Sequence, residues 1–170
     1  MSETTEHQGS SVNEGAGGQK ATQVDFYHLK DDKLALAVAM LADKAVASGH
    51  KMLVMTAQAQ IPAISEALWT TKPDSFLAHG CDDDEGADNA PVWITTQTDQ
   101  NSIQAHFACV TDGMVPAGIN GFDRIFNIFD GTDDGAVQHA RAQWKGWTSE
   151  PGFSCRYFAQ DEQGRWTLKR

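Results

Sequence analysis

Residues 51–57, KMLVMTA, form a nearly unbroken apolar run of strand length. Such a run, without polar alternation, is typical of a strand buried on both faces of a parallel sheet. Residues 34–46 before it repeat apolar side chains at helical spacing and stop near Gly49. Residues 24–29, VDFYHL, predict an earlier strand, and residues 61–69 predict a second helix. This strand–helix–strand–helix order predicts an α/β fold: a single three-layer domain with right-handed crossovers and a mostly parallel central sheet.

The later part of the chain continues the pattern. We predict strands at residues 91–96, 104–112, 123–130, 155–160 and 164–169, a helix at 135–147, and a turn at 162–164. Residues 80–91 are acidic and contain glycine, which predicts a loop. Residues 1–22 are rich in Ser, Thr, Gly, Gln and Glu, which predicts a disordered tail, because such a segment buries too little apolar surface to offset its ordering entropy. The folded domain is therefore expected to span residues 23–170.

Charge and cysteine content limit the classes of function. The net charge of −10 argues against strong direct binding of nucleic acid, which needs Lys and Arg to neutralise phosphates, and against a membrane surface. Cys81, Cys109 and Cys155 form neither a disulfide framework nor a CxxC motif, so we expect reduced thiols. The chain has neither an apolar signal segment nor a run of the roughly 20 apolar residues that a membrane helix needs. These features predict a soluble cytoplasmic protein.

The sequence carries no motif that points to catalysis, a cofactor or a metal. Neither GxGxxG nor GxxxxGK[ST] follows the first strand, and G-x-S-x-G is absent. The acidic run 82–85 lacks the ligand spacing of an EF-hand, and the six histidines are scattered. We therefore expect no catalytic residue, no cofactor and no metal site. An α/β enzyme that acts on a small anionic substrate, or a nucleotide sensor, remains an alternative.

The helix at residues 135–147 is unusual because it carries cations in a strongly acidic chain. Arg141, Trp144 and Lys145 lie three and four residues apart, so they share one helical face. Val137, Ala140 and Trp147 would form the buried stripe. Either Trp144 belongs to the core beside ordinary surface charges, or the three residues hold a small anionic, apolar ligand such as a chain end.

A second aromatic feature flanks the TKPD turn at residues 71–74. Trp69 precedes this turn and Phe76 follows it. Each residue is either part of the core or the wall of a ligand site.

Five segments together resemble the chi subunit family of bacterial DNA polymerase III. They are DFYHL (25–29), GHKMLV (49–54), EALWTTKPDSFLAHG (66–80), FDRIFNIFDG (122–131) and ARAQWKGW (140–147). The resemblance spans about residues 24–160. It implies an α/β domain that looks like a nucleotide-binding fold without the nucleotide site. It also implies a non-enzymatic clamp-loader subunit that binds the psi subunit and, on another surface, the acidic, Phe-terminated C-terminal tail of single-stranded-DNA-binding protein.

The resemblance also implies roles for single residues in binding that tail. Arg141 would hold the terminal carboxylate, Trp144 would lie beside the pocket for the terminal Phe, and Lys145 would attract the Asp residues of the tail. Trp69 and Phe76 would form the apolar wall of the same pocket, with Lys72 beside them. The tail 1–22, the acidic loop 81–88 and the long region 148–170 depart from the family pattern. Psi itself would be a partner only where the host has one.

Overall fold

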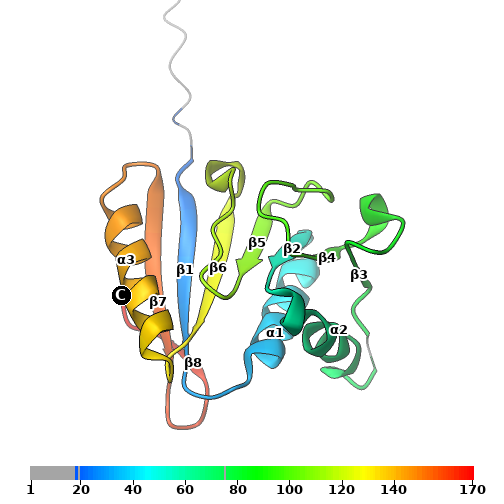
Figure 1. The fold of residues 1–170 in the computed structure, drawn as a ribbon, viewed down its shortest axis with the longest axis horizontal. Coiled ribbons are helices and arrows are strands. Elements are labelled where there is room, and N and C mark those ends of the chain that lie inside the picture. Colours follow the sequence, from blue (N-terminus) through cyan, green and yellow to red (C-terminus); the bar gives the residue numbers. More distant parts are fainter. Residues whose placement is uncertain (1–17, 19, 75) are drawn as a thin grey trace, which may run out of the picture.

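The computed structural model describes residue 18 and residues 20–74 and 76–170 (Figure 1). Most of the sequence-predicted tail, residues 1–22, lies outside the described residues, and the first strand begins at Thr22. The strands of the described part are β1 (Thr22–Leu29), β2 (Met52–Met55), β3 (His79–Cys81), β4 (Val92–Thr95), β5 (Phe107–Val110), β6 (Arg124–Asp130), β7 (Phe153–Gln160) and β8 (Trp166–Leu168). The helices are α1 (Leu34–Ala47), α2 (Ile61–Thr70) and α3 (Asp134–Thr148), with short 3₁₀ turns at Gln58–Gln60, Ala87–Asn89 and Ile119–Gly121.

The strands form one mixed sheet in the order β3-β4-β2-β5-β6-β1-β7-β8. Every neighbouring pair is parallel except β7 and β8, which are antiparallel. The predicted α/β class and the mostly parallel sheet are confirmed. β7 pairs with β1, so the late region of the chain widens the sheet beyond the first strand.

Alternate residues of the buried strands feed two hydrophobic layers. Met52 and Val54 of β2 pack with α1 and α2, whereas Leu53 and Met55 pack on the opposite face with α3. All four β2 residues are buried, as the continuous apolar run predicted. The sheet therefore carries α1 and α2 on one face and α3 on the other, and Figure 1 shows α3 and α2 at opposite ends of the sheet.

The predicted loop at residues 80–91 is wrong at its start, because β3 forms there and pairs with β4. Gly80, the first residue of the predicted loop, meets a packing requirement within β3. A Cβ at Gly80 would stand 2.5 Å from the Trp93 ring. The glycine therefore lets the edge strand pass close over a large buried side chain.

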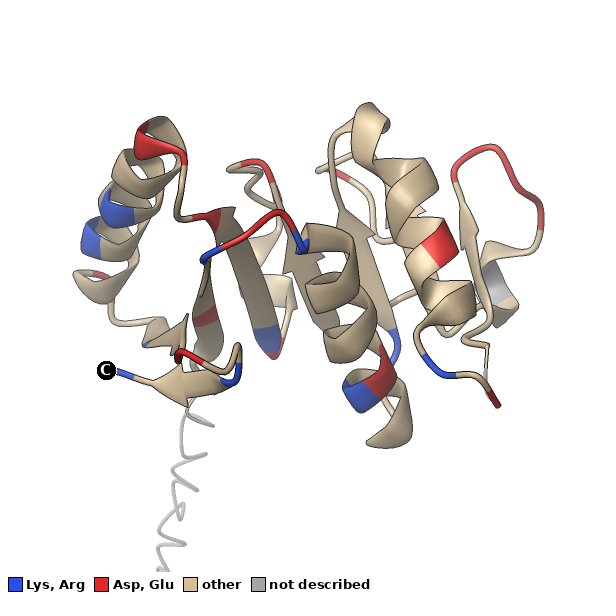
Figure 2. Cartoon of the chain, turned by 90° about the horizontal axis from the view of Figure 1, so that it is seen from below, with Lys and Arg blue, Asp and Glu red and all other residues tan. Residues whose placement is uncertain are grey.

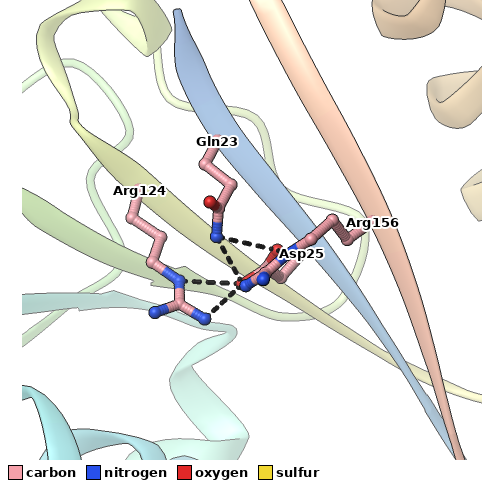
Figure 3. A network of polar contacts seen from close by, with 4 residues as sticks. All are labelled: Gln23, Asp25, Arg124 and Arg156. Atoms are coloured by element: carbon pink, nitrogen blue, oxygen red, sulfur yellow. Dashed lines mark hydrogen bonds and ion pairs between the residues drawn. The ribbon is translucent and has the colours of Figure 1, made fainter. Parts of the chain in front are cut away.

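A buried ion network joins β6, β1 and β7, toward one end of the sheet (Figure 3). Asp25 of β1 is fully buried. Its carboxylate accepts hydrogen bonds from Arg124 of β6 and Arg156 of β7, at 2.8 Å from each Nε, and from Gln23. The two guanidinium groups satisfy the buried charge from both neighbouring strands.

Candidate functional site

The position of α3 is set by an N-cap residue and by two buried side chains. Asp133 caps the helix, since its side chain accepts hydrogen bonds from the amides of Gly135 (2.7 Å) and Ala136 (3.3 Å). Ala140 and Trp147 are buried against the sheet. This anchoring fixes the rotation of the helix, so that Arg141 lies along one edge of the packed face.

A cavity of about 340 Å³ opens between α3 and the ends of β1, β6 and β7, and we call it the α3 pocket. Its apolar lining consists of Phe26, Phe129, Val137, Ala140, Trp144 and Tyr157, and its polar lining of His28, Arg141, Lys169 and Arg170. Aromatic walls and three basic side chains thus meet in one site of ligand size. This combination suits a ligand that has both an apolar ring and an anionic group.

Trp144 belongs to the core and to the pocket at once. Its half-buried ring packs edge-on against Phe26, with centroids 5.3 Å apart, and lies 6.3 Å from the ring of Tyr157. The same side chain lines the α3 pocket. The two interpretations of Trp144 offered by the sequence are therefore compatible.

The cations of the site are arranged differently from the sequence pattern. Arg141 lines the α3 pocket. Lys145, one turn further along α3, is exposed and does not line this pocket. Lys169 and Arg170, which follow β8, supply the other positive charges. Sequence reasoning missed them because the parallel pairing of β7 with β1 is what brings the chain end to α3.

His28 and Tyr157 form a hydrogen-bonded pair in the lining. His28 Nδ1 and the Tyr157 hydroxyl are 2.5 Å apart. Burial, together with the charges of Lys30 and Arg141, lowers the pKa of His28, and burial raises the pKa of Tyr157. Sequence reasoning also missed this pair, although β-strand alternation places His28 on the same face of β1 as Phe26.

Trp69, Lys72 and Phe76 lie elsewhere. Trp69 lies in the last turn of α2 with 48% of its surface exposed, Phe76 is 68% exposed, and their ring centroids are 5.2 Å apart. Lys72 Nζ forms an ion pair with Asp43 of α1 at 2.6 Å. The structure does not bring this group to Arg141, because α2 covers the β2–β4 end of the sheet and α3 the β1–β7 end (Figure 1).

A second cavity, of about 540 Å³, lies at the carboxyl ends of β1, β5 and β6. Nucleotide-binding α/β folds bind their ligands in this place, where neighbouring strands lead to helices on opposite faces. Here the lining carries carboxylates: Asp31, Asp32, Asp112, Asp130 and Asp133. This acidic cavity would repel a phosphate, which disfavours a nucleotide sensor.

Among the residues that the structure describes, no group of three or more His, Cys, Asp and Glu side chains is placed to hold a metal ion. None of the helices found there is long and apolar enough to cross a bilayer.

The sequence was found to match a known family over most of its length. A family model described as "DNA polymerase III chi subunit, HolC" matches residues 21–154. This range includes Arg141, Trp144 and Lys145, and also Trp69, Lys72 and Phe76, but it ends before Tyr157, Lys169 and Arg170. No curated protein matched the chain.

Proposed function

This chain belongs to the DNA polymerase III chi subunit family, and from that premise we propose that its α3 pocket binds the acidic, Phe-terminated tail of single-stranded-DNA-binding protein. Family membership gives the chain an accessory role in replication. In the proposed mechanism the chain is a non-catalytic adaptor within the clamp-loader assembly. It would hold the polymerase to the protein that coats single-stranded DNA.

The observation that carries this proposal is the joint lining of the α3 pocket by aromatic and basic side chains. The terminal Phe ring of the tail would pack among Phe26, Trp144 and Tyr157. Its carboxylate would accept hydrogen bonds from Arg141, whose planar guanidinium can bind a carboxylate through two parallel bonds. The Asp residues of the tail would be attracted by Lys145, Lys169 and Arg170.

We propose that Trp69 and Phe76 serve the second expected partner, the psi subunit, and not the tail. Both rings are exposed, whereas large aromatic residues usually bury their surface. Leu36 and Met40 of α1 are each 41% exposed and share a helical face with Asp43, which pairs with Lys72 beside Trp69. An apolar surface thus spans α1, α2 and the turn after α2, at the end of the sheet opposite the α3 pocket.

Calorimetric titration of the full chain tests the tail proposal. A peptide ending in Asp-Asp-Asp-Ile-Pro-Phe is expected to bind with a Kd of roughly 1 μM, as a short segment with one buried anchor would. Removal of the terminal Phe should abolish binding, and Arg141→Ala should weaken it by about 2 kcal/mol.

Arg165→Ala is the matched control, because Arg165 is exposed in the β7–β8 turn and pairs with Asp161. The affinity of this variant for the tail peptide should equal that of the unmodified chain. Equal binding by the Arg141 and Arg165 variants, or by a peptide without the Phe, would contradict the tail site.

Co-purification with a psi subunit tests the second surface. The double variant Trp69→Ala/Phe76→Ala should lose psi and keep the tail peptide, whereas Arg141→Ala should do the reverse. Val115→Ala, which removes an exposed apolar side chain from another loop, should affect neither partner. Loss of the tail peptide in the Trp69/Phe76 variant would show that the two groups act on one ligand after all.

A further inference from the structure

His28 and Tyr157 add a hydrogen-bonded, titratable pair to the aromatic lining of the α3 pocket. Both side chains are partly buried, both line the cavity, and a single hydrogen bond of 2.5 Å joins them. The pair also lies beside Arg141, since the charge of Arg141 acts on the pKa of each residue. A titratable group and a hydroxyl are therefore placed where an anion would bind.

The two ring nitrogens of His28 face different neighbours: Nε2 lies against Gly131, and Nδ1 lies against the Tyr157 hydroxyl. In the neutral tautomer that carries its hydrogen on Nε2, Nδ1 is an acceptor and the Tyr157 hydroxyl donates its hydrogen to it. The Tyr157 oxygen is left with lone pairs, which repel a carboxylate.

Protonation of His28 reverses the hydrogen bond. Both ring nitrogens of an imidazolium donate, so Nδ1 donates to the Tyr157 oxygen and the hydroxyl hydrogen becomes free for another acceptor. One proton taken up from solvent thus adds a positive charge and a hydroxyl donor to the lining of the pocket.

We propose that His28 and Tyr157 are a proton-linked anion-binding pair, through which the α3 pocket binds a carboxylate-terminated peptide more tightly when His28 is protonated. This inference rests on the proposed tail site and adds a condition to it. It assigns the terminal carboxylate a second contact, the Tyr157 hydroxyl, next to Arg141.

The charges around His28 give the sign of the effect. Lys30 of the loop after β1 and Arg141 of α3 disfavour its protonation, Asp130 at the end of β6 favours it, and Tyr157 of β7 bonds to it. Lys169 and Arg170 complete the charged lining. A bound carboxylate brings negative charge and raises the pKa of His28. By linkage, affinity is then lowest well above this pKa and rises as the pH falls through it.

Titration of the same peptide into the full chain at pH 8.0, 7.0, 6.0 and 5.5 tests the pair. The carboxylates of the peptide, with ordinary pKa values of about 4, stay ionised in this range. Binding should be about fivefold tighter at pH 5.5 than at pH 8.0. His28→Gln should reduce this response to less than about twofold, and Tyr157→Phe should at least halve it.

His106→Gln is the matched control, because His106 is exposed and pairs with Asp123 outside the pocket. It should keep the full response. A full response in His28→Gln would overturn the proposal, and a full response in Tyr157→Phe would overturn the role of the hydroxyl. An Arg141-dependent affinity with the same value at every pH would contradict the pair alone, whereas no binding at any pH would contradict the tail site and the pair with it.

The pKa of His28 gives an independent readout by NMR of the imidazole protons, with His28→Gln assigning the resonance. Saturating peptide should raise the pKa of His28. An unchanged or lowered pKa of His28 in the bound state would overturn the proposal, even if the affinity happened to vary with pH.

Discussion

Asp25 shows how one buried charge organises three strands. Its carboxylate is fully buried, and its hydrogen-bonding partners come from β6 and β7 on either side of β1. Asp25→Asn keeps the shape but removes the charge, which leaves the guanidinium groups of Arg124 and Arg156 without a counter-ion. We expect a loss of about 3 kcal/mol in the free energy of unfolding, measured by urea denaturation, since breaking a buried ion pair usually costs about 3–5 kcal/mol and these arginines are partly solvated.

The comparison variant is Asp161→Asn, at the more exposed pair with Arg165, where a much smaller loss of stability is expected. Equal losses of stability at the two positions would mean that the buried charge of Asp25 contributes no more than the charge of an exposed ion pair.

Single side chains of the site could be predicted from the sequence only where the residues beside them are also close in the sequence. Arg141, Trp144 and Lys145 stand out from the sequence because helical spacing places them on one face. Tyr157 does not, because its partner His28 lies 129 residues away and the two meet through the pairing of β1 with β7. A pattern of period two or 3.6 says which way a side chain points within its element, and nothing about the strand that will lie beside it.

The sequence predicted most helices and strands and their mostly parallel sheet, but not the separation of α2 from α3 along that sheet. The helix predicted at 135–147 is α3, within two residues at each end. Trp69 and Phe76 do not line the α3 pocket with Arg141, and similarity to a family does not show at which end of a sheet a segment lies. The sheet order places five strands between β3, which follows Phe76, and β7.

The turn from β6 to α3 provides a test of how these elements fit together. A Cβ at Gly131 would stand 1.8 Å from His28 Nε2 and 2.5 Å from the Leu29 carbonyl oxygen, so Gly131→Ala must displace the strand end or the imidazole. We expect a loss of about 2 kcal/mol in stability, seen as a lower Tm, together with weaker peptide binding.

Gly146→Ala should have the opposite effect. Gly146 lies within α3, and a Cβ there would meet no heavy atom within 4 Å. Alanine is a better helix former than glycine, so a gain of roughly 0.5–1 kcal/mol is expected. If both substitutions destabilise the protein, the effect of Gly131→Ala cannot be assigned to the close approach of His28 to Gly131.

Over the molecule as a whole, the net negative charge opposes binding of the acidic tail, except near α3, where positive charges are concentrated. The net charge is −10, yet residues 135–170 contain more cations than anions. Figure 2 shows basic residues on α3, and acidic residues at the start of this helix and in several loops of the molecule. At long range the protein should therefore repel both DNA and an acidic peptide, while at contact distance the α3 pocket should attract the peptide.

Ionic strength separates these two effects. Attraction by Arg141, Lys169 and Arg170 acts over a few ångströms, whereas the net charge acts over distances longer than the Debye length, which is about 10 Å at 0.1 M salt. Comparing the peptide Asp-Asp-Asp-Ile-Pro-Phe with Asn-Asn-Asn-Ile-Pro-Phe isolates the contribution of the three carboxylates, because the terminal Phe and its carboxylate are the same in both.

We expect the Asp peptide to bind more tightly at about 0.05 M salt, and its advantage to shrink as salt approaches about 0.5 M. Single-stranded DNA should show no measurable binding to the isolated chain by fluorescence anisotropy at about 0.1 M salt, since phosphates meet the repulsion of the net charge without an apolar anchor to hold them. Tighter binding of the Asn peptide at low salt would mean that the net charge outweighs the basic residues near α3. In that case the aromatic lining and Arg141 alone would have to account for recognition of the tail.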